Sequence, residues 1–181
     1  FITAVQDKPA SYTAFMTMYY TGMRVGELCA LTPADVDLKN NTIAISKTFQ
    51  RINGKDVVWA PKTPKSNRTI KMPEFLCEEM QDYMKQLYRI GKNDRLFEVT
   101  KSYLHHEMDR GSKSAGVKRI RIHDLRHSHV SLLINQGYQA AAIADRVGHE
   151  TVEITDRYTH IYPSKQNEMA NTLDELWKER K

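Results

Sequence analysis

The spacing of apolar residues changes from a helical to a strand pattern and back along this chain, and this change limits the possible folds. Residues 42–72 have the strand pattern: Ile43 and Ile45 alternate with other residues, and Asn53-Gly54 is a strong signal for a two-residue β-hairpin. The flanking segments have helical spacing. The sequence therefore predicts an α+β fold, mainly helical, with one small antiparallel β-sheet.

The helices are expected on both sides of this strand region. Gly22 and Gly148 each follow a helical segment, as glycines at helix C-termini commonly do. Thr32-Pro33 is typical of the start of a short helical turn. The segments expected to be helical are 10–21, 24–31, 73–91, a segment after Thr100, 123–137, 140–147, 151–158 and a terminal segment from Pro163.

Length and composition indicate one globular domain. The chain has 181 residues, of which 40% are hydrophobic and 27% charged, and its net charge of +5 fits a phosphate-rich partner. It contains no stretch of about 20 apolar residues such as a membrane helix needs. Cys29 and Cys77 are far apart and outside any paired motif, so we expect reduced, buried thiols. Phe1 is not a natural start, so we expect a piece of a longer protein.

Five residues distributed over the chain carry complementary groups that can act on a phosphodiester. Arg24 and Arg126 can each hold oxygens of a phosphodiester, His123 and His149 can donate hydrogen bonds or move protons, and the hydroxyl of Tyr158 can attack phosphorus. Guanidinium groups can stabilise the charge that develops on phosphorus, as metal ions do in other enzymes. Each residue alone has an ordinary structural explanation, and only the combined pattern indicates phosphoryl transfer.

A metal site is the alternative interpretation of one of these motifs. His123 and His127 are four residues apart, like the two histidines of a zinc-protease helix. That motif requires Glu directly after the first His, whereas this chain has Asp124. Arg126 would also place a positive charge beside the metal, so we expect no metal here.

The combined motifs resemble those of the tyrosine recombinase (phage integrase) family, and the resemblance covers nearly the whole chain. The order and spacing of these motifs in this chain agree with those of the family, including the nine-residue interval from His149 to Tyr158. The sequence around Arg126 is most similar to that of integrases of bacterial phages and conjugative transposons. The matching pieces are Thr-Gly-Met-Arg24-Val-Gly-Glu-Leu, His123-Asp-Leu-Arg126-His-Ser-His, Val-Gly148-His149 and Asp-Arg-Tyr158-Thr-His-Ile.

The resemblance implies a role for each matched residue. Tyr158 would attack the scissile phosphate of DNA and form a 3′-phosphotyrosyl bond. Arg24 and Arg126 would bind the non-bridging oxygens. His123 would help to take the tyrosine proton, and His149 would donate a hydrogen bond to the phosphate. No cofactor, metal or ATP would be needed.

The family also uses a lysine on a β-hairpin loop to protonate the leaving 5′-oxygen. The basic loop 61–68 is the counterpart here. Lys62 matches best, and Lys65 is the alternative for the same role. Lys65 and Arg68 also fit non-specific contacts with DNA phosphates.

The resemblance further implies the setting in which the chain acts. Residues 1–181 would be the catalytic domain, a C-terminal fragment whose core-binding and arm-binding domains precede it. The expected partner is double-stranded DNA, bound by a homotetramer, with a monomer as the alternative for the free fragment. Residues 164–181 carry an apolar stripe that would dock on a neighbouring protomer or on their own domain. A cytoplasmic, nucleoid-associated location in a bacterium follows from this setting.

Three functions remain at this point. The first is integration and excision of a mobile element. The second is a related enzyme with the same chemistry, either a recombinase that resolves chromosome dimers or a type IB topoisomerase. The third is a non-catalytic DNA-binding module, which would be expected to have lost Tyr158 or one arginine, and neither is lost.

Overall fold

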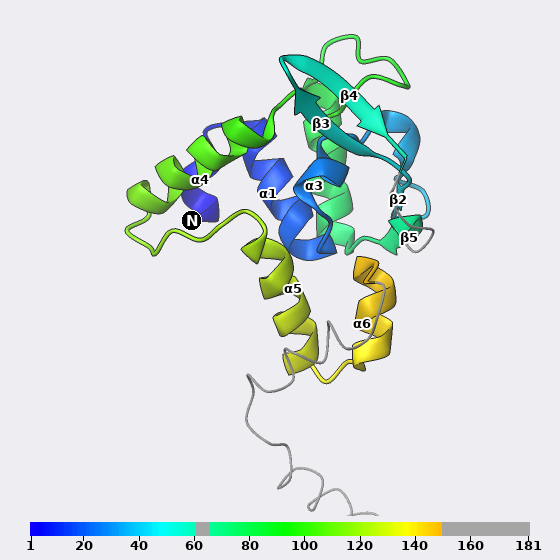
Figure 1. The fold of residues 1–181 in the computed structure, drawn as a ribbon, viewed down its shortest axis with the longest axis vertical. Helices are drawn as coiled ribbons and strands as arrows, with labels where there is room; N and C mark the ends of the chain where they lie inside the picture. Colours follow the sequence, from blue (N-terminus) through cyan, green and yellow to red (C-terminus); the bar gives the residue numbers. More distant parts are fainter. Residues whose placement is uncertain (61–65, 150–181) are drawn as a thin grey trace, which may run out of the picture.

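The computed structural model describes residues 1–60 and 66–149, which form a helical body carrying two small sheets (Figure 1). The first helices are a 3₁₀ turn η1 (Ile2–Val5), α1 (Pro9–Thr21) and α2 (Val25–Leu28). Gly22 ends α1 in the left-handed conformation, with φ of 68°, as its position in the sequence predicts. The expected helix over 24–31 is wrong in length, since α2 ends at Leu28 and the next residues form buried non-helical chain.

The strands form two sheets rather than the single sheet that we expected. After a 3₁₀ turn η2 (Pro33–Asp35), β1 (Val36–Asp37), β2 (Thr42–Ile45) and β5 (Arg68–Lys71) build an antiparallel sheet in the order β1-β2-β5. β3 (Thr48–Ile52) and β4 (Lys55–Trp59) pair only with each other. β2 already has a neighbour on each edge, so the hairpin has no free edge of β2 to join.

The hairpin turn forms where the sequence predicts it. Asn53 and Gly54 have φ of 50° and 77°, and positive φ at both central residues is what a type I′ turn requires. Ile52 and Lys55 therefore face each other across the turn.

The helix after Pro73 is shorter than its apolar pattern indicates. α3 spans Glu74–Gln86, not 73–91, and Arg89 has a positive φ of 49° that no α-helix contains. Leu87 and Ile90 still pack against the core. The periodic signal persists past the helix because the following loop covers the same apolar surface.

Three more helices complete the described part. They are α4 (Lys101–Ser114), α5 (Asp124–Asn135) and α6 (Ala140–Val147). The Thr100 side chain caps α4 by accepting from the N–H of Tyr103. α5 packs on α1, and α6 contacts both α5 and β5, so α6 lies beside the sheet edge (Figure 1).

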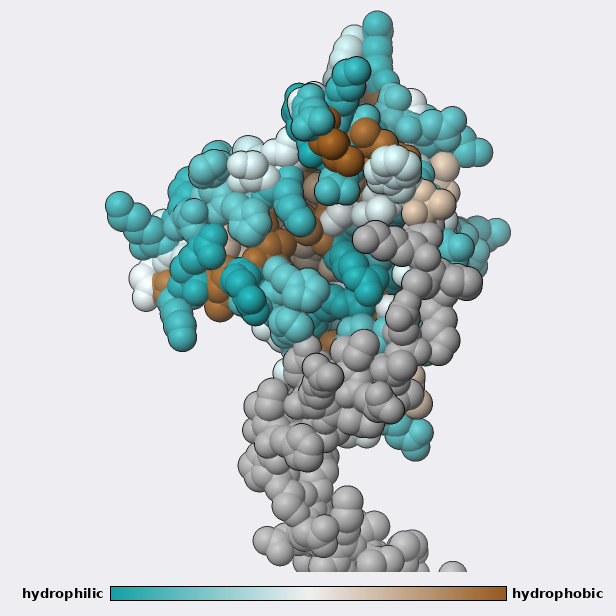
Figure 2. Space-filling view, viewed as in Figure 1, coloured by the Kyte–Doolittle hydropathy of each residue, from teal (hydrophilic) through white to brown (hydrophobic). Residues whose placement is uncertain are grey.

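The core lies between α1, α3, α4 and the three-stranded sheet. Phe15 and Phe97 are among its fully buried side chains, and the rings of Tyr83 and Phe97 stack at 5.1 Å between centroids. Cys29 and Cys77 are buried free thiols, as we expected. None of the helices in the described ranges combines the length and apolar character needed to cross a membrane. Hydrophilic side chains cover much of the visible surface, with hydrophobic groups beside α4 and the β3–β4 hairpin (Figure 2).

Candidate active site

Arg24 is held at the N-terminus of α2 by a carboxylate one turn further on. Its backbone N–H donates to Glu27 Oε2 at 2.8 Å, and its Nη1 donates to Glu27 Oε1 at 3.0 Å. A cation at a helix N-terminus is disfavoured by the helix dipole, and the Glu27 charge offsets this. The Arg24 side chain remains 40% exposed, so a bound anion can reach it.

Glu27 is buried and shared between two arginines. Arg68 donates from Nη1 to Oε1 at 3.1 Å and from Nη2 to Oε2 at 2.8 Å, a two-bond fork. Burial alone would raise the pKa of Glu27, but hydrogen bonds and charge from Arg68, and then from Arg24, lower it below its usual value. Glu27 is therefore an ionised, buried carboxylate that holds both arginines.

Arg68 is therefore held inside the domain by Glu27. We grouped it with Lys65 as a DNA contact, but its side chain is only 6% exposed and faces Glu27. A guanidinium in this position offers little surface to a DNA phosphate.

Arg126 enters the same region from the first turn of α5. It is 3% exposed, and its Nη1 donates to the carbonyl oxygen of Gly22 at 2.7 Å. Gly22 is needed there for two reasons. Its φ of 68° suits glycine, and a Cβ atom would come within 2.6 Å of His129 and 2.9 Å of Val147. The glycine that ends α1 therefore also supplies an oxygen that orients Arg126.

His123 precedes α5 and lies against His127. The two ring centroids are 4.7 Å apart and the rings are almost perpendicular. Desolvation lowers the pKa of His123, and the positive charges of His127, Arg126 and Arg24 lower it further. The imidazole is thus biased toward its neutral form, which can accept a proton.

His149 follows the C-terminus of α6, where the sequence places it. Gly148 has φ of 70° and turns the chain, and its carbonyl oxygen accepts a hydrogen bond from Arg24 Nη2 at 3.3 Å. Desolvation, followed by the charges of Arg126 and Arg24, lowers the pKa of His149 to about 4. A neutral imidazole still has one N–H to donate.

Arg146 fixes α6, and with it His149, to the rest of the body. Its Nε donates to His129 Nε2 at 3.2 Å, and its two Nη atoms donate to the carbonyl oxygens of Lys71 and Tyr20, each at 3.1 Å. These three acceptors belong to α5, β5 and α1. Sequence reasoning missed Arg146 and His129, because an arginine in a short helix has no local signal for such distant partners.

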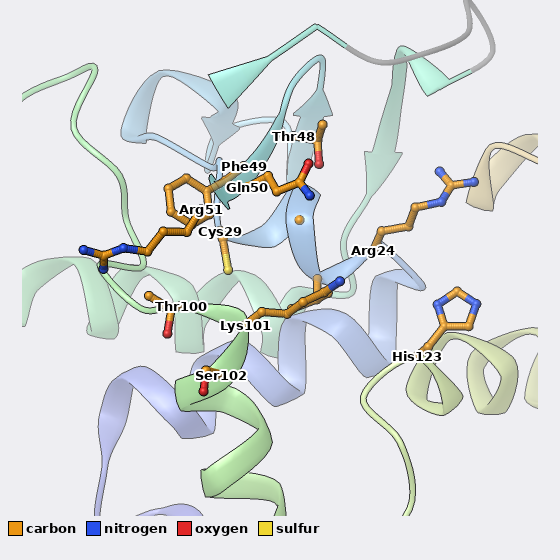
Figure 3. Close-up of a pocket in the computed structure, with 12 residues that line it drawn as sticks. Arg24, Cys29, Thr48, Phe49, Gln50, Arg51, Thr100, Lys101, Ser102 and His123 are labelled. Carbon is orange, nitrogen blue, oxygen red and sulfur yellow. The ribbon is translucent and has the colours of Figure 1, made fainter. Parts of the chain in front are cut away.

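A cavity of about 700 Å³ opens beside these groups (Figure 3). Arg24 and His123 line one end of it, and Lys101 lies in the middle. Gln50 and Arg51 of β3 contribute from the hairpin side. The cavity is rich in hydrogen-bond donors and basic groups, as a site for a phosphate-bearing ligand requires.

The structure thus brings together four of the predicted residues: Arg24, His123, Arg126 and His149. The electrostatic influence of both arginines on both histidines reflects this proximity. Lys62, Lys65 and Tyr158 lie outside the described residues, as does the segment 164–181. In the ranges that are described, no group of three His, Cys, Asp or Glu side chains is arranged to hold a metal ion.

The model of the phage integrase family matches residues 2–165. The chain belongs to the phage integrase family. The match spans most of the chain and includes every predicted catalytic residue, so the motif resemblance is confirmed at the level of the family.

Curated members of the phage integrase family show the same relationship. The ICEBs1 integrase of Bacillus subtilis (strain 168) is 34% identical over 185 residues, which cover 94% of this chain and 50% of that protein. The integrase of Staphylococcus phage L54a is 33% identical over 174 residues, covering 86% and 49%. The chain therefore spans about half the length of these relatives.

Solved structures show the tyrosine recombinase catalytic fold. A Tn1549 transposon integrase in complex with transposon right-end DNA superposes with a TM-score of 0.79 at 21% identity, covering 97% of this chain and 62% of that one. The XerA recombinase superposes with a TM-score of 0.72 at 28% identity, covering 94% and 58%. The predicted fold class is confirmed.

Proposed function

We propose that this chain is the catalytic part of a site-specific DNA recombinase that cuts and rejoins DNA through a 3′-phosphotyrosyl intermediate. The observation that carries the proposal is the convergence of Arg24, Arg126, His123 and His149. Two of them, Arg24 and His123, line one end of an open cavity. Membership of the phage integrase family and the names of its relatives support it.

The reaction exchanges one phosphodiester bond for another. The Tyr158 hydroxyl oxygen attacks phosphorus and loses its proton to the neutral His123. The bond from phosphorus to the 5′-oxygen breaks, and Lys62 protonates that oxygen, with Lys65 as the alternative donor. Arg24 and Arg126 stabilise the charge on the non-bridging oxygens, while His149 donates to one of them. Rejoining is the reverse attack by a 5′-hydroxyl, so the bond energy is conserved.

The partner and assembly follow from the same proposal. The ligand is double-stranded DNA, and the active assembly is a homotetramer whose 164–181 segments dock between protomers. The protein acts in the bacterial cytoplasm on the nucleoid. The similarity to the ICEBs1 and phage L54a integrases favours integration and excision of a mobile element over dimer resolution.

The test is a search for the covalent intermediate. The 181-residue chain is incubated, in parallel reactions with EDTA and with Mg²⁺, with nicked suicide duplexes whose central sequence is randomised, and each mixture is separated on a denaturing gel. We expect a protein–DNA adduct that Tyr158→Phe does not form. Cleavage that depends on a metal and leaves no adduct would refute the proposal, as would an undiminished adduct with Tyr158→Phe. Sequencing the trapped DNA identifies the preferred duplex.

A further inference from the structure

The Arg68 guanidinium joins three segments that each carry a predicted catalytic residue. Its two Nη atoms hold the Glu27 carboxylate, which in turn holds Arg24. Its Nε donates to the carbonyl oxygen of Arg146 at 3.0 Å, three residues before His149. Its Nη1 also donates to the carbonyl oxygen of Ser66 at 3.1 Å, and Ser66 follows Lys65 directly in the basic loop 61–68.

The burial of this side chain separates it from a DNA contact. Arg68 and Glu27 are each 6% exposed at the side chain, whereas Arg24 is 40% exposed. A DNA phosphate can therefore approach Arg24 but meets little of Arg68. Breaking a buried ion pair by removing one partner is strongly unfavourable, which keeps Arg68 and Glu27 together.

The charge of Arg68 also affects what Arg24 can do. Arg24 shares the Glu27 carboxylate with Arg68, so the buried negative charge is balanced mainly by the arginine that is hidden from solvent. Without Arg68, Arg24 would be the nearest cation to Glu27 and would be drawn to it. Its charge would then be less available to a phosphate in the cavity.

We propose that Arg68 is a positioning residue of the recombinase reaction: acting through Glu27, it holds Arg24 in place, and through the backbone carbonyl of Arg146 it fixes the end of the helix that leads to His149. This inference rests on the proposed function. It replaces the earlier assignment of Arg68 as a DNA contact.

Arg68→Lys is the informative substitution, because lysine keeps the positive charge but not the planar fork. A single ammonium group cannot satisfy both Glu27 oxygens and two carbonyls with the same geometry. We expect the single-turnover rate of adduct formation, at saturating amounts of the selected duplex, to fall by about 100-fold, the order that misplacement of a catalytic group by 1 Å can cause. The affinity for uncleaved duplex, measured with Tyr158→Phe as the background, should change little.

Arg110→Lys is a matched control. Arg110 also pairs with a buried carboxylate: its Nε and Nη2 both donate to Oε2 of Glu107, and it additionally contacts Asp7. This cluster joins α4 to the segment before α1, and its hydrogen bonds connect Arg110 to Glu107, Asp7 and Ala4, none of which is a predicted catalytic residue. Arg110→Lys should lower Tm without lowering the cleavage rate measured well below Tm.

A double-mutant cycle tests whether Arg68 works through Arg24. If it does, Arg68→Lys should slow an Arg24→Lys chain by much less than it slows the wild type. A wild-type rate for Arg68→Lys, a loss confined to DNA affinity, or fully additive effects in the cycle would overturn the inference and leave the proposed function standing. A wild-type chain that forms no adduct would overturn both.

Discussion

His129 is a buried histidine that should make the stability of this domain depend on pH. It is 3% exposed, and its Nε2 accepts a hydrogen bond from Arg146 Nε. Protonation of Nε2 would remove this acceptor and place a second positive charge beside the guanidinium. Desolvation, followed by the charge of Arg146, lowers the pKa of His129 from 6.5 to about 4.

The size of the effect follows from this difference in pKa. Between about pH 4 and pH 6.5 the unfolded chain binds a proton at His129 that the folded chain does not. The free energy of unfolding should therefore fall as the pH drops through 6.5, and the loss should level off below about pH 4. One pKa unit corresponds to about 1.4 kcal/mol, so the full loss is about 3 kcal/mol, of which about 2 kcal/mol is reached at pH 5.

The assay is urea unfolding at pH 7.5 and pH 5.0 for the wild type and for His129→Gln. Glutamine keeps an oxygen that can accept from Arg146 but does not titrate. Between pH 7.5 and pH 5.0, the free energy of unfolding of the wild type should fall by about 2 kcal/mol more than that of His129→Gln. His123 and His149 are present in both proteins, so their contributions cancel.

His106→Gln removes an exposed histidine and measures the general effect of such a substitution on the unfolding curves. Equal losses of stability in the wild type and in His129→Gln would refute the reasoning. They would mean that Arg146 does not depend on a neutral His129.

Two further predictions concern the backbone at Gly22 and the thiol of Cys29. Gly22→Ala should lower the free energy of unfolding, measured in urea, by about 2–4 kcal/mol, because the new Cβ would combine a positive φ with contacts of 2.6 and 2.9 Å. Gly116 has a positive φ but no atom within 4 Å of such a Cβ, so Gly116→Ala should lower the free energy of unfolding by only about 1 kcal/mol. Equal losses in the two variants would contradict the packing argument. Desolvation raises the pKa of Cys29 to about 11, so in a Cys77→Ser chain this thiol should react with a disulfide reagent at pH 8 only as fast as the domain unfolds. Rapid labelling in the absence of urea would show that Cys29 is accessible.

The residues that sequence reasoning placed correctly depend on local structure. Gly148 ends α6 because glycine readily adopts a positive φ, and this fixes where His149 emerges. His123 and Arg126 are three residues apart at the start of α5, so they share a helix face. The hairpin at Asn53-Gly54 has the same local origin. Such features need only a few consecutive residues to be specified.

The features that sequence reasoning missed depend on distant partners. Arg68 donates to Glu27, which is 41 residues away in the sequence, and Arg126 donates to the Gly22 carbonyl, which is 104 residues away. Nothing in the sequence near Arg68 or near Glu27 indicates that these two side chains are buried together. The overlong helix after Pro73 has a related cause, because Leu87 and Ile90 pack on the core without being helical.

The residues proposed to contact DNA and the buried residues that position them have different roles in the site. Three of the groups proposed to touch DNA lie next to helix ends: Arg24 before α2, His123 before α5 and His149 after α6. A helix end by itself fixes a side chain poorly, since its terminal backbone groups lack partners within the helix. The buried Glu27–Arg68 pair ties α2 to β5, and the Arg146 guanidinium ties α6 to α5 and β5, so these contacts supply the missing constraints. Substitutions among these supporting residues should therefore slow the reaction more than they weaken DNA binding.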